Sequence, residues 1–358
     1  MRLCDVTLRE AVQLSDREYT VDQRVAAGEA LDQLDIPFVQ AGFPAVGETE
    51  QEVTATLTDR LDADVVAIAR AVESDVTAAL ETGADVVELF VPVSDKQLEH
   101  VVGRSREEMY ETAGKRIEQI RDGGAQPHLT LMDGFRTDER AIASAFERFD
   151  CPIVVADTVG ARTPSYVAGY LRTLADLGVD LSRAGVHFHD DLGCATANAL
   201  VAAQTGVDRI DVSVASLGER AGNPATEEVV TAIVQEGGDP EVQTDRLIPT
   251  AESVLDALGE SIDARKPVLG REVTTHESGI HTDAMLTDPS TFEPFDPATF
   301  GGARRLVFGA GTGRGAARKL LGRVERKATD ERVEQLLDRL AAEGPVELDG
   351  ALSLAKEV

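Results

Sequence analysis

Eight repeats of one local pattern constrain the fold of this chain more than any other feature of its sequence. A short apolar run rich in β-branched residues is followed by an amphipathic helical stretch, and this pair recurs eight times within about 240 residues. Helices are expected between the runs, for example at 21–34, 104–121, 164–177 and 195–205. The strands are expected at 3–9, 38–42, 65–69, 86–91, 128–132, 153–157, 185–189 and 209–214.

Alternating strands and helices are typical of a parallel sheet, and eight units match the size of a closed (β/α)8 TIM barrel. The alternative is a doubly wound open sheet with helices on both faces. The alternation stops near residue 245. We therefore expect a TIM-barrel catalytic domain at 1–244 and a small, mostly helical C-terminal subdomain at 245–358, with no regulatory domain.

The composition is strongly acidic, with 64 Asp and Glu against 35 Lys and Arg and a net charge of −29. Binding to nucleic acid or to an anionic membrane is not expected, because both need clustered cations. No apolar run reaches the roughly 20 residues of a membrane span, and three widely spaced cysteines fit no disulfide framework. These features predict a cytoplasmic protein. Acidity spread along the whole chain indicates a halophile, and the alternative is an ordinary acidic enzyme.

Polar residues follow the predicted strands where barrel enzymes carry their active sites. His187 and His189 lie at the end of the seventh strand, and their i, i+2 spacing puts both side chains on one side. A single histidine there is more often a hydrogen-bonded core residue. Closing the barrel brings strands one, seven and eight together, so Glu10 and Asn223 can join the histidines around one divalent ion such as Zn²⁺, Mn²⁺ or Mg²⁺.

Four motifs together resemble the DRE-TIM metallolyases, and within them the 2-isopropylmalate, homocitrate and citramalate synthases. They occur in the family's order and at barrel-compatible spacing over nearly the whole chain. The motifs are DVTLREAVQ at 5–13, HFHDDLG at 187–193, GERAGN at 218–223 and HESGIH at 276–281.

The resemblance implies an acyltransferase that condenses acetyl-CoA with a 2-oxoacid, with a metal bound by Glu10, His187, His189 and Asn223. It implies that Arg9 polarises the reacting carbonyl oxygen or enolate. A divalent ion chelated by the keto and carboxylate oxygens makes the ketone electrophilic.

The resemblance further implies that Thr158 contacts the oxoacid carboxylate and that His281 transfers a proton, often from the neighbouring subunit of a homodimer. Glu219 is a further catalytic candidate. The remaining candidates for substrate binding are Gln13, Ser94, Glu88 and Arg136.

The chain departs from the family at several substrate-side positions, which leaves the identity of the 2-oxoacid open. The departures are Ala11, Val12, Gln40, Glu88, Met132 and the run 309–313. Two rival functions are a carbon–carbon lyase similar to hydroxymethylglutaryl-CoA lyase and a non-catalytic barrel. A nucleotide-binding interpretation of the glycine-rich turn at 309–315 is disfavoured because no βαβ unit follows it.

Overall fold

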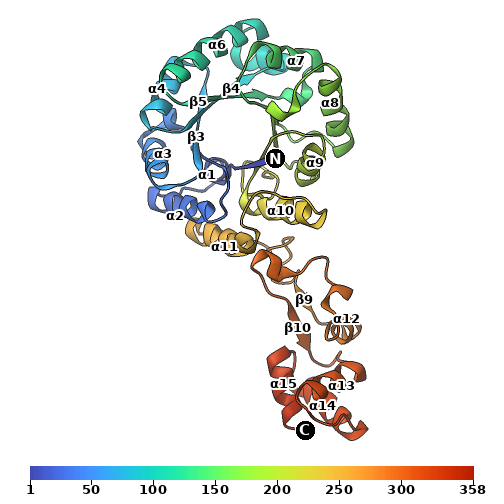
Figure 1. Cartoon of the computed structure of the whole chain (residues 1–358). Helices are drawn as coiled ribbons and strands as arrows, with labels where there is room; N and C mark the ends of the chain where they lie inside the picture. Colours follow the sequence, from blue (N-terminus) through green and yellow to red (C-terminus); the bar gives the residue numbers. More distant parts are fainter. The chain divides into compact units, whose positions relative to one another are not determined.

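The computed structural model describes residues 1–358 and divides them into two compact units. The first unit comprises Met1–Gln243 and Thr250–Ser261, and the second comprises Thr244–Pro249 and Ile262–Val358. In the first unit eight parallel strands form a closed barrel in the order β1 to β8, and helices surround it (Figure 1). The predicted TIM barrel is therefore confirmed.

The barrel strands lie close to the predicted runs, and all eight begin within two residues of the predicted start. The strands are β1 Arg2–Asp5, β2 Phe38–Gly42, β3 Asp64–Arg70, β4 Val86–Pro92, β5 Gln126–Met132, β6 Ile153–Asp157, β7 Ala184–Phe188 and β8 Arg209–Val212. The helices of this part of the chain are α1 Thr7–Ala11, α2 Val21–Asp32, α3 Glu48–Arg60, α4 Glu73–Glu81, α5 Asp95–Gln97, α6 Arg106–Asp122, α7 Glu139–Arg148, α8 Pro164–Asp176, α9 Ala195–Ala203, α10 Thr226–Gln235 and α11 Leu247–Leu258.

Local sequence explains where several helices begin. Thr20 and Gln23 form a capping box at the start of α2, and Ser105 and Glu108 form another at the start of α6. Each box satisfies backbone N–H groups that have no partner inside the helix. Pro164 occupies the first turn of α8, where a missing N–H is tolerated.

The prediction for the first strand was wrong beyond Asp5. The chain leaves the barrel there and forms the short helix α1, which contains Arg9 and Glu10. The Asp5 carboxylate accepts a hydrogen bond from the Thr7 backbone N–H (2.8 Å), a local contact that turns the chain. Glu10 therefore reaches the site from a helix and not from a strand end.

The second unit is mostly helical, as expected, and also contains a small sheet that the sequence patterns did not predict. The sheet has the order β11-β10-β9, with β9 parallel and β11 antiparallel to β10. Its apolar core includes Phe308, Leu320 and Leu336. The elements are β9 Thr275–His276, α12 Gly279–Met285, β10 Arg305–Phe308, α13 Arg314–Arg323, α14 Asp330–Glu343, β11 Val346–Glu347 and α15 Leu348–Lys356.

Candidate metal centre and active site

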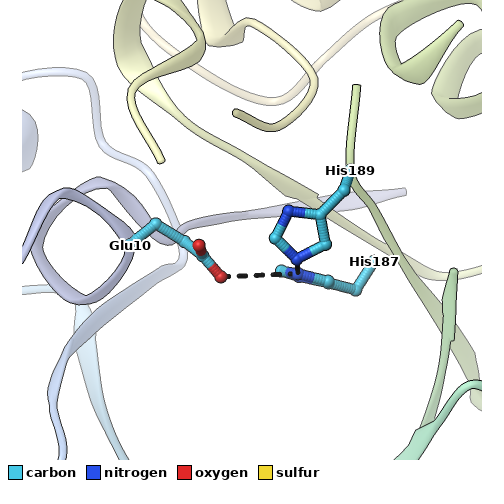
Figure 2. Close-up of side chains that lie close together, drawn as sticks. All are labelled: Glu10, His187 and His189. Carbon is cyan, nitrogen blue, oxygen red and sulfur yellow. Dashed lines mark hydrogen bonds and ion pairs between the residues drawn. The ribbon is translucent and has the colours of Figure 1, made fainter. Parts of the chain in front are cut away.

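Glu10, His187 and His189 converge at one end of the barrel (Figure 2). His187 lies in β7 and His189 directly after it, and both imidazoles are buried. The Nε2 atom of His187 lies 3.4 Å from Nε2 of His189 and 3.5 Å from Oε1 of Glu10. One ligand atom from each residue lies within 4.8 Å of the other two. The structure thus brings together three of the four predicted metal ligands from α1 and from β7 with its following loop.

The chemistry of these atoms fits a divalent cation. Oε1 of Glu10 is buried, forms an ion pair with Arg9 and accepts no other hydrogen bond. The two Nε2 atoms face each other, so their lone pairs repel unless a proton or a cation lies between them. Two ligand atoms that each lie about 2.1 Å from one ion are separated by about 3 to 3.4 Å, which agrees with the observed spacing of the two nitrogens. Mixed oxygen and nitrogen donors suit Zn²⁺, Mn²⁺ or similar ions.

Protonation states in the cluster also suit metal binding. Burial, and then the neighbouring His187, lowers the pKa of His189 to about 3, so its imidazole is neutral near pH 7. Burial by itself raises the pKa of Glu10, but the positive charge of Arg9, together with the nearby His187 and His189, outweighs burial and holds the pKa below its ordinary value. A carboxylate and a neutral imidazole are the forms that bind metal.

Asn223, the fourth predicted ligand, lies beside His187. Its Nδ2 donates to the backbone oxygen of Phe188 (3.0 Å) and lies 3.4 Å from His187 Nε2. Its buried Oδ1 has no hydrogen-bond partner. A Cβ atom on Gly218 would lie 2.2 Å from this Oδ1, so the glycine leaves the space that the amide fills. The Asn223 atom that faces His187 is therefore the amide nitrogen, while the oxygen packs against Gly218.

Asp211 orients one of the imidazoles. Its Oδ2 lies 3.0 Å from Nδ1 of His187, and its Oδ1 accepts from Nε of Arg209 (2.8 Å). Burial alone would raise the pKa of Asp211, but Arg209 and the hydrogen bond with His187 hold it below its ordinary value. A carboxylate on Nδ1 leaves Nε2 as the free nitrogen of His187.

Further polar contacts connect Asp211 through Arg209 to the opposite side of the site. Arg209 Nη1 pairs with Glu88 Oε2 (2.7 Å), and Glu88 Oε1 accepts from Gln40 Nε2 (3.3 Å). Gln40 Oε1 in turn accepts from Arg9 Nε (2.6 Å), and Arg9 forms an ion pair with Glu10. One connected network therefore joins the candidate metal ligands to Arg9, the predicted enolate-binding residue, through charged side chains inside the barrel.

Sequence reasoning did not single out Arg209 and Asp211. The signal was present, because two charged residues at i, i+2 in a predicted barrel strand point to the same side. Both are almost completely buried, which is rare for charged side chains unless they are paired. Gln40, noted as a departure from the family, connects Arg9 to Glu88.

A cavity of about 220 Å³ lies over the network and the imidazoles. Five of the predicted catalytic and substrate-binding residues line it together with two predicted metal ligands. Its lining comprises Arg9, Gln13, Phe43, Ile68, Glu88, Phe90, Thr130, Met132, Ala156, Thr158, His187, His189, Asp211 and Glu219.

Ser94 and Arg136 line a different cleft, of about 460 Å³, beside the β4, β5 and β6 ends. Both side chains bind Asp133: Ser94 Oγ donates to its Oδ2, and Arg136 donates from Nε (2.6 Å) and Nη2 (2.7 Å). Thr158 connects the two regions, because its Oγ1 accepts from the Asp133 backbone N–H (2.8 Å). The structure thus separates these two candidates from the other substrate-binding candidates.

His281 lies on α12 in the second unit. Its ring stacks on Phe292, with the ring centroids 3.9 Å apart. The catalytic role assigned to His281 stays a prediction.

No helix of the chain has the length and apolar character needed to cross a membrane.

Comparison with known proteins gives two family matches. The family described as HMGL-like matches residues 1–254, and the domain described as homocitrate synthase post-HMGL domain-like matches residues 268–345. The chain is 36% identical to the homocitrate synthase AksA of Methanopyrus kandleri over 346 residues, which cover 95% of this chain and 87% of that protein.

Two further comparisons extend this result. The chain is 32% identical over 346 residues to a probable 2-isopropylmalate synthase of the same organism, covering 95% of this chain and 69% of that protein. Among solved structures, hydroxymethylglutaryl-CoA lyase from Pseudomonas aeruginosa superposes with a TM-score of 0.66 at 22% identity, covering 76% of this chain and 96% of that chain. At this identity the structural likeness shows the fold alone.

Proposed function

The chain belongs to the HMGL-like family of DRE-TIM metallolyases, and from this premise we propose that it is an acyltransferase that condenses acetyl-CoA with a 2-oxoacid. The observation that carries the proposal is the similarity over 95% of the chain to synthases of this reaction type. The methyl carbon of acetyl-CoA loses a proton and bonds to the keto carbon of the oxoacid. Water then cleaves the thioester, giving a 2-hydroxy dicarboxylate and free CoA.

We propose Glu10, His187 and His189 as ligands of a divalent cation, with Asn223 as a fourth contact. The convergence of the Glu10 carboxylate and the two imidazoles supports this assignment, and so does the buried Asn223 Oδ1, which has no hydrogen-bond partner. The cation would polarise the ketone and stabilise negative charge on its oxygen. Asp211 holds the His187 ring so that Nε2 faces the site.

Arg9 and Thr158 are proposed to bind the reacting groups. Arg9 lines the cavity and carries a fixed positive charge, which stabilises charge developing on an enolate or carbonyl oxygen. The Thr158 hydroxyl lines the same cavity and can donate to the oxoacid carboxylate while it accepts from Asp133 N. Glu219 stays a catalytic candidate, since it lines the cavity, and its backbone N–H donates to Glu10 Oε2 (3.4 Å). His281 is proposed to move the proton in an active homodimer, because an imidazole can act as a general acid or base.

The test is an assay for free thiol released from acetyl-CoA, run with a panel of 2-oxoacids and with Mn²⁺, Mg²⁺ or Zn²⁺ added to metal-free protein. Oxoacid-dependent CoA release that needs the metal is expected. The proposed condensation would be contradicted if CoA release did not depend on the oxoacid, or if no oxoacid gave CoA release. His281→Ala should lower turnover by roughly 10²-fold or more and leave metal content unchanged.

We also propose that the protein works at high salt. Repulsion at a net charge of −29 is screened strongly only when the Debye length falls to about 3 Å, near 1 M salt. Melting temperatures measured from 0.1 to 3 M KCl should rise steeply, whereas a flat profile would remove the halophilic assignment.

A further inference from the structure

The two sides of the site cavity differ in chemistry. One side carries the proposed metal ligands and Arg9, which come from α1 and from β7 and β8 with their following loops. These groups would bind the keto and carboxylate groups that all 2-oxoacids share. In the closed barrel β3, β4 and β5 lie across from these elements. Their side of the cavity, which we call the substituent wall, consists of Ile68, Glu88, Phe90, Thr130 and Met132. The part of the oxoacid that varies between substrates is left to face this wall.

The substituent wall has one charged group, the Glu88 carboxylate. Its Oε1 accepts from Thr130 Oγ1 (2.7 Å) and from Gln40 Nε2 (3.3 Å). Its Oε2 pairs with Arg209, which is buried beneath the cavity and is also bound by Asp211. The only cation beside Glu88 is thus already shared between two carboxylates.

No unpaired cation lines the cavity. Arg9 is its only lysine or arginine, and it is bound to Glu10 and Gln40. Arg70, at the end of β3, donates to both oxygens of Asp75 (2.6 and 3.0 Å) and does not line the cavity. A second carboxylate on the substrate would therefore meet Glu88 and find no partner, which is unfavourable for a buried charge.

We propose that the oxoacid carries a short, uncharged, apolar substituent and that Glu88 excludes oxoacids with a second carboxylate. This inference rests on the proposed condensation. Ile68, Phe90 and Met132 supply the apolar surface for the substituent, while the anionic Glu88 beneath them sets the charge that is accepted. Discrimination by charge is larger than discrimination by one methylene, which is worth about 10- to 200-fold in an apolar pocket.

The first experiment compares kcat/KM for pyruvate, 2-oxobutyrate and 2-oxoisovalerate with the values for 2-oxoglutarate and oxaloacetate. The best uncharged oxoacid should exceed both dicarboxylates by at least about 10²-fold. A dicarboxylate that reacts equally well would overturn the inference and leave the condensation standing. Calorimetry then measures binding of the same oxoacids in the presence of Mn²⁺ and without acetyl-CoA. If the uncharged oxoacids bind preferentially but the assay shows no CoA release, the wall assignment is supported and the condensation is contradicted.

Two variants test the wall itself. Glu88→Gln removes the charge and keeps an oxygen for Arg209, so the ratio of 2-oxoglutarate to pyruvate kcat/KM should rise at least 10-fold. Thr130→Val is the matched control, since it removes a hydrogen bond to Glu88 without changing charge and should leave this ratio within about twofold. Met132→Lys adds a cation at the half-exposed end of the wall and should raise the same ratio even if Glu88→Gln does not fold. An unchanged ratio in folded Met132→Lys would overturn the assignment of this wall to the substituent.

Discussion

The barrel interior and the core of the second unit bury different kinds of side chain. Inside the barrel Arg209 forms ion pairs with both Glu88 and Asp211, and all three side chains are less than 5% exposed. The core of the second unit is apolar and includes Phe308 and Leu336, both fully buried. Buried charges gain little net stability because desolvation offsets their attraction. The comparison indicates that the barrel interior is built to orient a site, whereas the second core is built to stabilise a fold.

The largest expected effect comes from removing one of the proposed metal ligands. His187→Ala should abolish stoichiometric metal retention and lower turnover by more than about 10²-fold, because a ligand and the group oriented by Asp211 are lost together. Elemental analysis after gel filtration measures the metal, and circular dichroism checks the fold. His276→Ala, which removes an imidazole from the second unit, is the control and should retain the metal. Full metal content in His187→Ala would refute the proposed ligand set.

Breaking the buried network should destabilise the barrel strongly. Arg209→Ala leaves the carboxylates of Glu88 and Asp211 without their cation, which costs about 3–5 kcal/mol in the free energy of unfolding. Urea unfolding at 2 M KCl measures this change.

A triple variant separates stability from orientation in the same network. Arg209→Met with Glu88→Gln and Asp211→Asn has no unpaired charge and should recover most of the stability. Its metal affinity should still fall by about 10- to 100-fold, because the carboxylate that holds His187 is gone. Wild-type metal affinity in this variant would show that the network does not orient the site.

The matched change in the second unit affects stability alone. Leu336→Ala on α14 opens a cavity in the apolar core and should cost about 2–5 kcal/mol, measured by the same urea unfolding. Metal retention at room temperature should be unchanged. Loss of metal from the folded variant would contradict the division of roles between the two regions.

The smallest effect expected is a pH dependence confined to the barrel interior. Burial, and then the charges of Arg209 and Arg2, lowers the pKa of His128 to about 3, against the opposing influence of Asp211. Below about pH 6.5 the unfolded chain binds a proton that the folded chain does not, so stability falls as the pH decreases. This group should contribute about 2 kcal/mol of lost stability between pH 6.5 and pH 5.

The free energy of unfolding is measured as a function of pH for this chain and for His128→Asn. In the difference between the two profiles, the contributions of titrating groups that both proteins share cancel. The amide oxygen of the replacement can still accept from Arg209, as Nδ1 of His128 does at 3.0 Å. The variant should show a shallower stability profile over this pH range, and parallel profiles would contradict the assignment.

Local patterns in the sequence determined the strands, the helices and the pairing of two imidazoles on one side of β7. Apolar runs and the i, i+2 spacing encode these features within a few residues. The motifs also predicted Glu10, His187, His189 and Asn223 as candidate metal ligands. These predictions needed only neighbouring residues and the closure of an eight-stranded barrel.

The tertiary structure decided which distant side chains touch. The turn after Asp5 moved Glu10 onto α1, and the side chains across the barrel formed the connection from Arg209 through Glu88 and Gln40. It also separated Ser94 from the site cavity. Such contacts depend on strand register and on the depth of each residue inside the barrel, which arise when strands far apart in sequence pair. A local pattern carries no information about a partner 100 residues away, so these contacts could be recognised only in the folded chain.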